Sequence, residues 1–97
     1  MPSMTVEIMP IAQDDVDQAL IYIASDDPSA ADRLYDAILE RLNQVALQPY
    51  SAPEVQIGRR IYRKLYVHPY TLYYRIIGDK IIVMRVLHER MDTRKYL

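Results

Sequence analysis

The sequence predicts an α+β domain in which a helical hairpin packs on one face of a mainly antiparallel sheet. Two consecutive stretches in the first half carry apolar residues at helical spacing. Three stretches in the second half alternate between apolar and polar residues as strands do, and a shorter alternating stretch precedes the first helix. At 97 residues the chain is expected to form one domain, residues 1–97, with the order β-α-α-β-β-β.

The first predicted elements are a short strand and a helix. Residues 4–9 alternate between apolar and polar side chains until a proline ends the strand. From about residue 11 to residue 25, apolar residues recur at helical spacing. Aspartates at positions 14, 15 and 17 crowd the opening turns, where carboxylates favour the helix dipole.

A second helix is predicted to start almost at once, because Asp26-Asp27-Pro28 places an acid at the N-cap and a proline at the first helical position. Its apolar stripe continues toward Pro49 and consists of Ala31, Leu34, Tyr35, Ile38, Leu42, Val45 and Ala46. Because the connection is so short, the two helices must fold back as an antiparallel hairpin.

The remaining elements are an irregular loop and three strands. Residues 49–60 contain two prolines and a glycine with little periodicity, which predicts a loop. Strands are expected at about 61–67, 70–77 and 80–88, with Gly78-Asp79 as a tight hairpin turn.

Strict alternation assigns the strand side chains to two faces. In the middle strand, one face is expected to hold Tyr70, Leu72, Tyr74 and Ile76, and the other Thr71, Tyr73, Arg75 and Ile77. In the last strand, the two sets are Ile82, Met84, Val86 and His88 against Ile81, Val83, Arg85 and Leu87. Both faces are substantially apolar, so the face that bears the arginines must be covered or used.

Composition excludes several classes of function. The absence of cysteine excludes a disulfide framework, a thiolate nucleophile and a cysteine-based zinc site. Two glycines are too few for a phosphate-cradling loop, and no metal-ligand spacing occurs, so neither cofactor nor metal is expected. No signal peptide or membrane-spanning stretch is predicted, which favours the cytoplasm and no contact with a membrane.

Charge is strongly polarised along the chain. Residues 1–50 hold two bases and nine acids, a net charge of -7, whereas residues 51–97 hold ten bases and four acids, a net charge of +6. Such clustering focuses a field that attracts charged partners.

Several motifs occur in an order and spacing that resembles the RelE/ParE superfamily of bacterial type II toxins, over nearly the whole chain. They are Tyr22-Ile23-Ala24, Asp27-Pro28 and Ala30-Ala31-Asp32-Arg33-Leu34 in the hairpin, the strand Tyr70-Thr-Leu-Tyr-Tyr74-Arg75, and the ending Arg85-Val-Leu-His88-Glu-Arg-Met91-Asp92. The Leu-His-x-x-Met-Asp ending is similar to the ParE branch in particular. The resemblance implies a toxin that a cognate antitoxin, usually of the ParD type, covers until the antitoxin is degraded.

The two branches of the superfamily imply different activities. ParE-like members poison DNA gyrase, and RelE-like members cut messenger RNA in the ribosome. Cutting RNA requires groups that move protons and cations that stabilise charge on phosphorus. The candidates for that role are Arg63, Arg75, Arg85, His88 and Tyr96. However, no dense His/Glu/Lys cluster is present, His88 is more simply interpreted as a hydrogen-bonded structural residue, and strand arginines commonly pair with carboxylates.

The leading hypothesis is therefore a gyrase inhibitor that acts by binding, with no catalytic residue of its own. The predicted target-binding residues are Arg59, Arg60, Arg63, Arg75, Arg85, Arg90, Arg94 and Lys95. The alternatives are a ribosome-dependent endoribonuclease and an attenuated relative that only binds antitoxin. Residues 89–97 are expected either to contact the target or to cover the edge of the last strand.

The antitoxin is expected to be an amphipathic, acidic segment that folds on binding, with an extended part approaching the sheet edge. It should lie over the hairpin, at Tyr22, Ile23, Leu34, Tyr35 and Ile38. The toxin alone is not expected to bind DNA sequence-specifically.

Overall fold

The computed structural model describes residues 4–97. Residues 1–3, part of the segment in which no signal peptide is predicted, lie outside the described residues. The elements are β1 (Thr5–Ile8), α1 (Pro10–Ala24), α2 (Pro28–Leu47), β2 (Glu54–Ile57), β3 (Arg60–Val67), β4 (Tyr70–Ile77), β5 (Lys80–His88) and α3 (Thr93–Tyr96). The predicted α+β class is confirmed, with one strand and one helical turn added.

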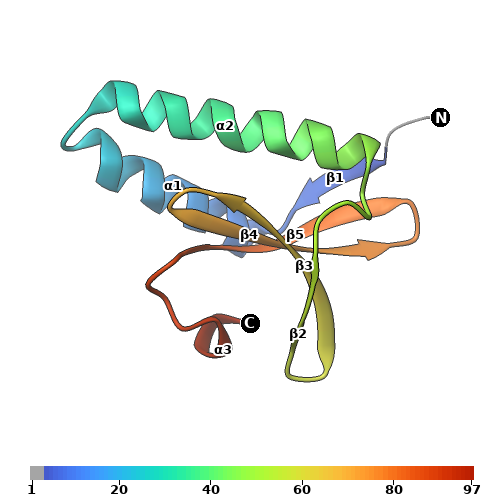
Figure 1. The fold of residues 1–97 in the computed structure, drawn as a ribbon. Helices are drawn as coiled ribbons and strands as arrows, with labels where there is room; N and C mark the ends of the chain where they lie inside the picture. Colours follow the sequence, from blue (N-terminus) through green and yellow to red (C-terminus); the bar gives the residue numbers. More distant parts are fainter. Residues whose placement is uncertain (1–3) are drawn as a thin grey trace.

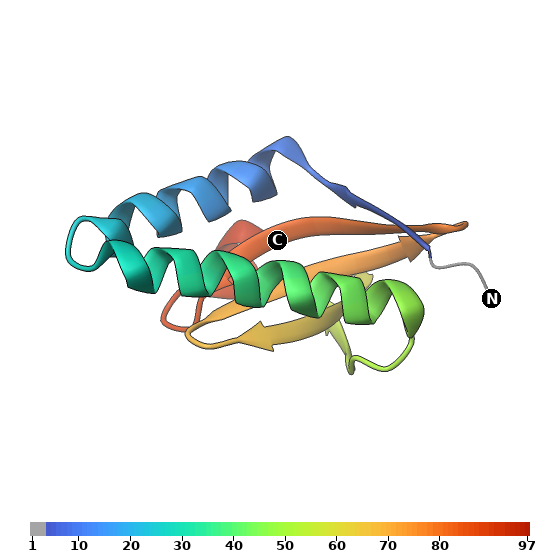
Figure 2. The same cartoon turned by 90° about the horizontal axis from the view of Figure 1, so that it is seen from above.

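The strands form one sheet in the order β1-β5-β4-β3-β2. β1 pairs with β5 in parallel, and every other pair is antiparallel. The α1–α2 hairpin covers one face of this sheet, as Figures 1 and 2 show. Within the part of the chain described, no helix is both long and apolar enough to cross a membrane.

β2 corrects the prediction of an irregular loop over residues 49–60. Glu54–Ile57 pairs antiparallel with residues 60–63 across a tight turn. Gly58 adopts φ 64° in that turn, a left-handed conformation that glycine tolerates without strain. Glu54–Ile57 does alternate between polar and apolar residues, but over only four residues between a proline and a glycine, so the segment was assigned to the surrounding loop.

Both helices of the hairpin begin with proline. α1 starts at Pro10, one residue earlier than predicted, because proline fits the first helical position. At the start of α2 the predicted N-cap is confirmed, since Asp27 Oδ1 accepts hydrogen bonds from the Ser29 and Ala30 amides. The Ser29 hydroxyl also donates to Asp27, and this bond is the largest cause of the lowered pKa of Asp27. The cap therefore stabilises the fold above the usual aspartate pKa and is lost as pH falls through the lowered value.

A β-bulge in β5 corrects the predicted faces of the last strand. Tyr73 pairs with Arg85 but Tyr74 pairs with Val83, so Met84 is the extra residue. The bulge reverses the alternation beyond it. Val86 therefore joins Ile81 and Val83 in the core beneath the helices, where strict alternation placed it on the opposite face.

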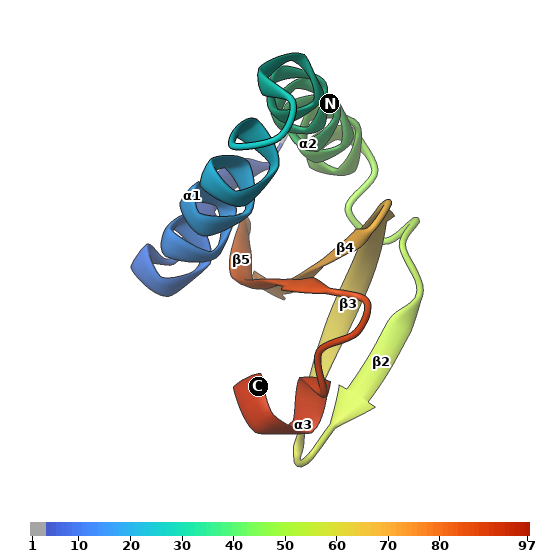
Figure 3. The same ribbon diagram turned by 90° about the vertical axis from the view of Figure 1, so that its left-hand side faces the viewer.

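The opposite face of the sheet carries a second apolar cluster. Tyr62, Tyr73 and Leu87 are buried there, and Met91 and Leu97 of the C-terminal tail pack against them. Figure 3 shows α3 on the side of the sheet away from the α1–α2 hairpin. The tail therefore covers part of this face of the sheet, whereas the structural alternative predicted from the sequence was a cover for the edge of the last strand.

Candidate functional site

Arg85 of β5 forms a bidentate ion pair with Asp15 of α1. The Arg85 Nε and Nη2 atoms each lie 2.8 Å from one oxygen of the Asp15 carboxylate. Both side chains are only 13% exposed. The Arg85 pKa is raised, chiefly by the hydrogen bond to Asp15. Two parallel hydrogen bonds fix the guanidinium in orientation as well as in charge.

Asp15 also takes the place of a strand partner at the edge of β5. β1 pairs with β5 only as far as Val83. Beyond that point the Val86 amide donates to Asp15 Oδ2 at 3.0 Å. The carboxylate therefore satisfies an edge amide and a part-buried cation at once. The sequence predicted that Arg85 could pair with a helix carboxylate, but it attributed Asp15 to the helix dipole and did not identify it as a site residue.

Arg85 also holds the C-terminal tail. Its Nη1 atom donates to the Tyr96 carbonyl at 3.1 Å, and its guanidinium carbon lies 5.4 Å from the centre of the Tyr96 ring. Within the tail, the Asp92 carboxylate accepts the Arg94 amide and caps α3. The ion pair thus joins α1, β5 and α3, and it brings together two of the residues predicted for an RNA-cutting site.

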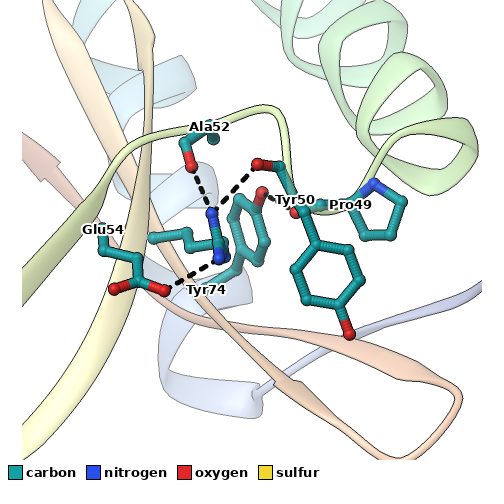
Figure 4. Close-up of polar contacts among 6 residues, drawn as sticks. Pro49, Tyr50, Ala52, Glu54 and Tyr74 are labelled. Atoms are coloured by element: carbon teal, nitrogen blue, oxygen red, sulfur yellow. Dashed lines mark hydrogen bonds and ion pairs between the residues drawn. The ribbon is translucent and has the colours of Figure 1, made fainter.

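Arg63 makes a comparable set of contacts beneath the α2–β2 connection. Its Nη1 atom donates to the Tyr50 and Ala52 carbonyls, and its Nη2 atom contacts Glu54 at 2.9 Å. Figure 4 shows these partners together with Tyr74, whose hydroxyl donates to the Pro49 carbonyl at 2.7 Å. These bonds anchor the connection to the sheet, which gives Arg63 a structural role.

Replacing Tyr74 with phenylalanine should lower the free energy of unfolding by about 1–2 kcal/mol, because the Pro49 carbonyl would lose its donor in a part-buried position. Chemical denaturation measures the change. Tyr62→Phe is the matched control, since the Tyr62 side chain is buried but its hydroxyl forms no hydrogen bond within residues 4–97. Equal stability of the two variants would show that the Tyr74 hydroxyl does not anchor the connection.

His88 has a local structural partner. Its Nδ1 atom accepts the Arg90 amide at 3.1 Å, and its ring meets Tyr70 edge-on at a centroid distance of 5.3 Å. No hydrogen bond or ion pair in the described chain joins His88 to Arg63, Arg85 or Tyr96. The five residues predicted for RNA cutting therefore form three groups. Arg85 contacts Tyr96, and Arg63 and Arg75 line a pocket beside Tyr50. Within residues 4–97, His88 bonds to none of these four, but it lines a hollow together with Asp15, the partner of Arg85.

The other predicted target-binding residues lie on the surface. Arg59 and Arg60 flank the β2–β3 turn, while Arg90, Arg94 and Lys95 lie in the tail, and all five are exposed. Of these five residues, Arg94 forms an ion pair, with Asp92 at 3.5 Å. The turn and α3 project from the same side of the sheet, away from the helices (Figure 3). We call these five residues the basic surface.

The hairpin residues predicted to bind antitoxin divide into two sets. Leu34 and Ile38 are 7% and 4% exposed and belong to the main core, because they face the sheet. Ile23 is half-buried, whereas Tyr22 and Tyr35 are 78% and 44% exposed. A hollow of about 420 Å³ lies between the helices and is lined by Leu20, Ile21, Ala24, Ala31, Asp32 and Tyr35. A partner on the hairpin would therefore meet Tyr35 and this hollow, with Leu34 and Ile38 beneath them.

Two comparisons with known proteins agree on the kind of protein, and a third agrees on the fold. Residues 6–93 match the family model described as the ParE toxin of the type II toxin-antitoxin system, parDE. Toxin RelE3 of Caulobacter vibrioides is 33% identical over 85 residues, which cover 87% of this chain and 92% of the relative. A solved structure of the chromosomal ParDE TA system from P. aeruginosa matches with a TM-score of 0.71 at 19% identity, covering 89% of this chain and 96% of that one. At that identity the structural likeness concerns the fold.

Proposed function

The chain belongs to the ParE toxin family of type II toxin-antitoxin systems, and on that premise we propose that it inhibits DNA gyrase by binding it. A cognate antitoxin of the ParD type neutralises it in this proposal, and both encounters take place in the cytoplasm. In this proposal the toxin alone does not bind DNA sequence-specifically.

The main support for this proposal is that Arg85 forms its hydrogen bonds within the protein. A cation that stabilises a phosphorane must direct free donors toward the substrate. Arg85 instead directs its donors to Asp15 and the Tyr96 carbonyl. Arg63 likewise donates to backbone carbonyls and to Glu54 within the protein. The exposed cations of the basic surface are suited to docking on an acidic or polyanionic target.

A ribosome-dependent endoribonuclease remains the second candidate. The observation in its favour is the contact of Arg85 with Tyr96, which joins two of the five residues predicted for that chemistry. If neither activity is present, the chain is an attenuated relative that only binds antitoxin.

Induction of the chain in growing cells separates these three functions. Gyrase inhibition stops thymidine incorporation first, and methionine incorporation declines later. Endoribonuclease activity reverses that order, and an attenuated relative alters neither. Co-expression of the antitoxin from the adjacent reading frame should restore both rates, which tests the proposed partner independently of the target.

His88→Asn should leave growth inhibition unchanged. The asparagine carbonyl can accept the Arg90 amide as the Nδ1 atom of His88 does, so the local structure is retained while the imidazole is lost. Colony counts after induction provide the measurement, with His88→Ala as the variant that also removes the acceptor. Loss of inhibition in a folded His88→Asn protein would support proton transfer by His88 and hence the endoribonuclease.

A further inference from the structure

The outer surface of the α1–α2 hairpin is acidic as well as apolar. Its exposed acids Asp14, Asp17, Asp32, Asp36 and Glu40 form no ion pair in the part of the chain described. The hairpin's two bases do not neutralise them. Arg33 lies 3.7 Å from Asp27 at the start of α2, and Arg41 donates to the Tyr66 carbonyl of the sheet. The hairpin therefore presents a negative field to any partner.

Two of these acids, Asp32 and Asp36, lie at or next to an apolar groove. The hollow between the helices holds Ile21 and Tyr35, and Leu39 continues the apolar surface one turn beyond Tyr35. Asp32 lines the hollow itself, and Asp36 follows it one turn later on α2. An amphipathic helix that lies in such a groove places its apolar stripe against side chains of this kind.

We propose that the antitoxin segment seated in this groove is an amphipathic helix with lysine or arginine on both sides of its apolar stripe. The proposal rests on the antitoxin of the proposed function and specifies its chemistry. It also changes the acidic segment expected from the sequence, because an acidic helix would bring like charges next to Asp32 and Asp36. Acidic residues of the same partner are instead suited to the basic surface on the other side of the sheet.

A pair of synthetic helices tests this inference on the complete toxin. Both have about 18 residues, long enough to follow most of α2, and carry the same leucine stripe, but one is flanked by lysine and the other by glutamate. Fluorescence anisotropy measures their affinity, and hydrogen exchange locates the contact. The lysine helix should bind at least tenfold more tightly and protect amides in residues 17–24 and 31–40.

Charge variants of the toxin make the test specific. Asp32→Asn/Asp36→Asn should weaken binding of the lysine helix about fivefold, since exposed ion pairs contribute up to about 1 kcal/mol each. Asp79→Asn, in the exposed β4–β5 turn, is the control and should leave binding unchanged. Tighter or equal binding of the glutamate helix, or protection elsewhere, would overturn the inference. The inference would also be overturned if the toxin formed a dimer and Asp32→Asn/Asp36→Asn abolished it, because a second copy of the toxin would then occupy the groove. Neutralisation by co-expressed antitoxin is scored separately, so the proposed partner can survive any of these results.

Discussion

Asp15→Ala should lower the free energy of unfolding by about 2–3 kcal/mol, somewhat less than the loss of one partner from a fully buried ion pair, because this pair is part-buried. The substitution leaves the Arg85 guanidinium at 13% exposure without its counter-ion. It also deprives the Val86 amide of its acceptor at the open edge of β5. Because Arg85 then lacks the partner that orients it, its bond to the Tyr96 carbonyl should weaken, and exchange of the α3 amides should accelerate.

Asp14→Ala is the matched control for that experiment. Asp14 is the same residue type in the same helical turn, but it is exposed and forms no ion pair within residues 4–97. Its removal should change stability by less than about 0.5 kcal/mol, as is usual for surface positions. If chemical denaturation gave the two variants equal stabilities, the Asp15–Arg85 pair would not be the connection that joins α1, β5 and the tail.

Arg90→Glu/Lys95→Glu should raise the toxin concentration needed for half-maximal gyrase inhibition at least tenfold, a change of about 1.4 kcal/mol. Both side chains are exposed on the basic surface, and neither forms an ion pair in the described part of the chain. Stability should therefore remain close to that of the parent, and the loss should be greater at low salt than at high salt.

Arg33→Glu is the control for charge alone. It reverses one charge on the helical side of the molecule, where it disturbs only the long contact with Asp27. For each reversed charge, Arg33→Glu should raise the toxin concentration needed for half-maximal gyrase inhibition far less than Arg90→Glu/Lys95→Glu does. Equal effects at the two locations would mean that net charge, and not the basic surface, determines the interaction with gyrase.

Most elements were predictable because their signals are local. The Asp27-Pro28 start of α2 combines a side-chain cap with the fixed φ of proline, and both act within one turn. β4 and β5 are long enough to show alternation. β2 alternates over only four residues, too few to distinguish a strand from the surrounding loop, and its pairing with β3 depends on the turn at Gly58. The bulge at Met84 was equally hidden, because strict alternation contains no information about an extra residue.

The candidate site was harder to predict because its contacts join distant parts of the sequence. Asp15 and Arg85 are separated by 70 residues. Helical spacing places Asp15 beside the buried positions of α1, and Asp14 and Asp17 on the other side, but no local rule pairs Asp15 with Arg85. Only the packing of α1 against the edge of β5 does so. The same limit applies to Leu34 and Tyr35, which share the apolar stripe predicted for α2, although one faces the core and the other faces solvent.

A gyrase assay with the purified chain tests the proposed function most directly. Relaxed plasmid, ATP and gyrase are incubated with increasing amounts of the toxin, and the products are separated after treatment with detergent and protease. The proposal predicts loss of supercoiled plasmid together with accumulation of linear DNA, both reversed by the cognate antitoxin. Full supercoiling without linear DNA at a large molar excess of folded toxin over gyrase would contradict it.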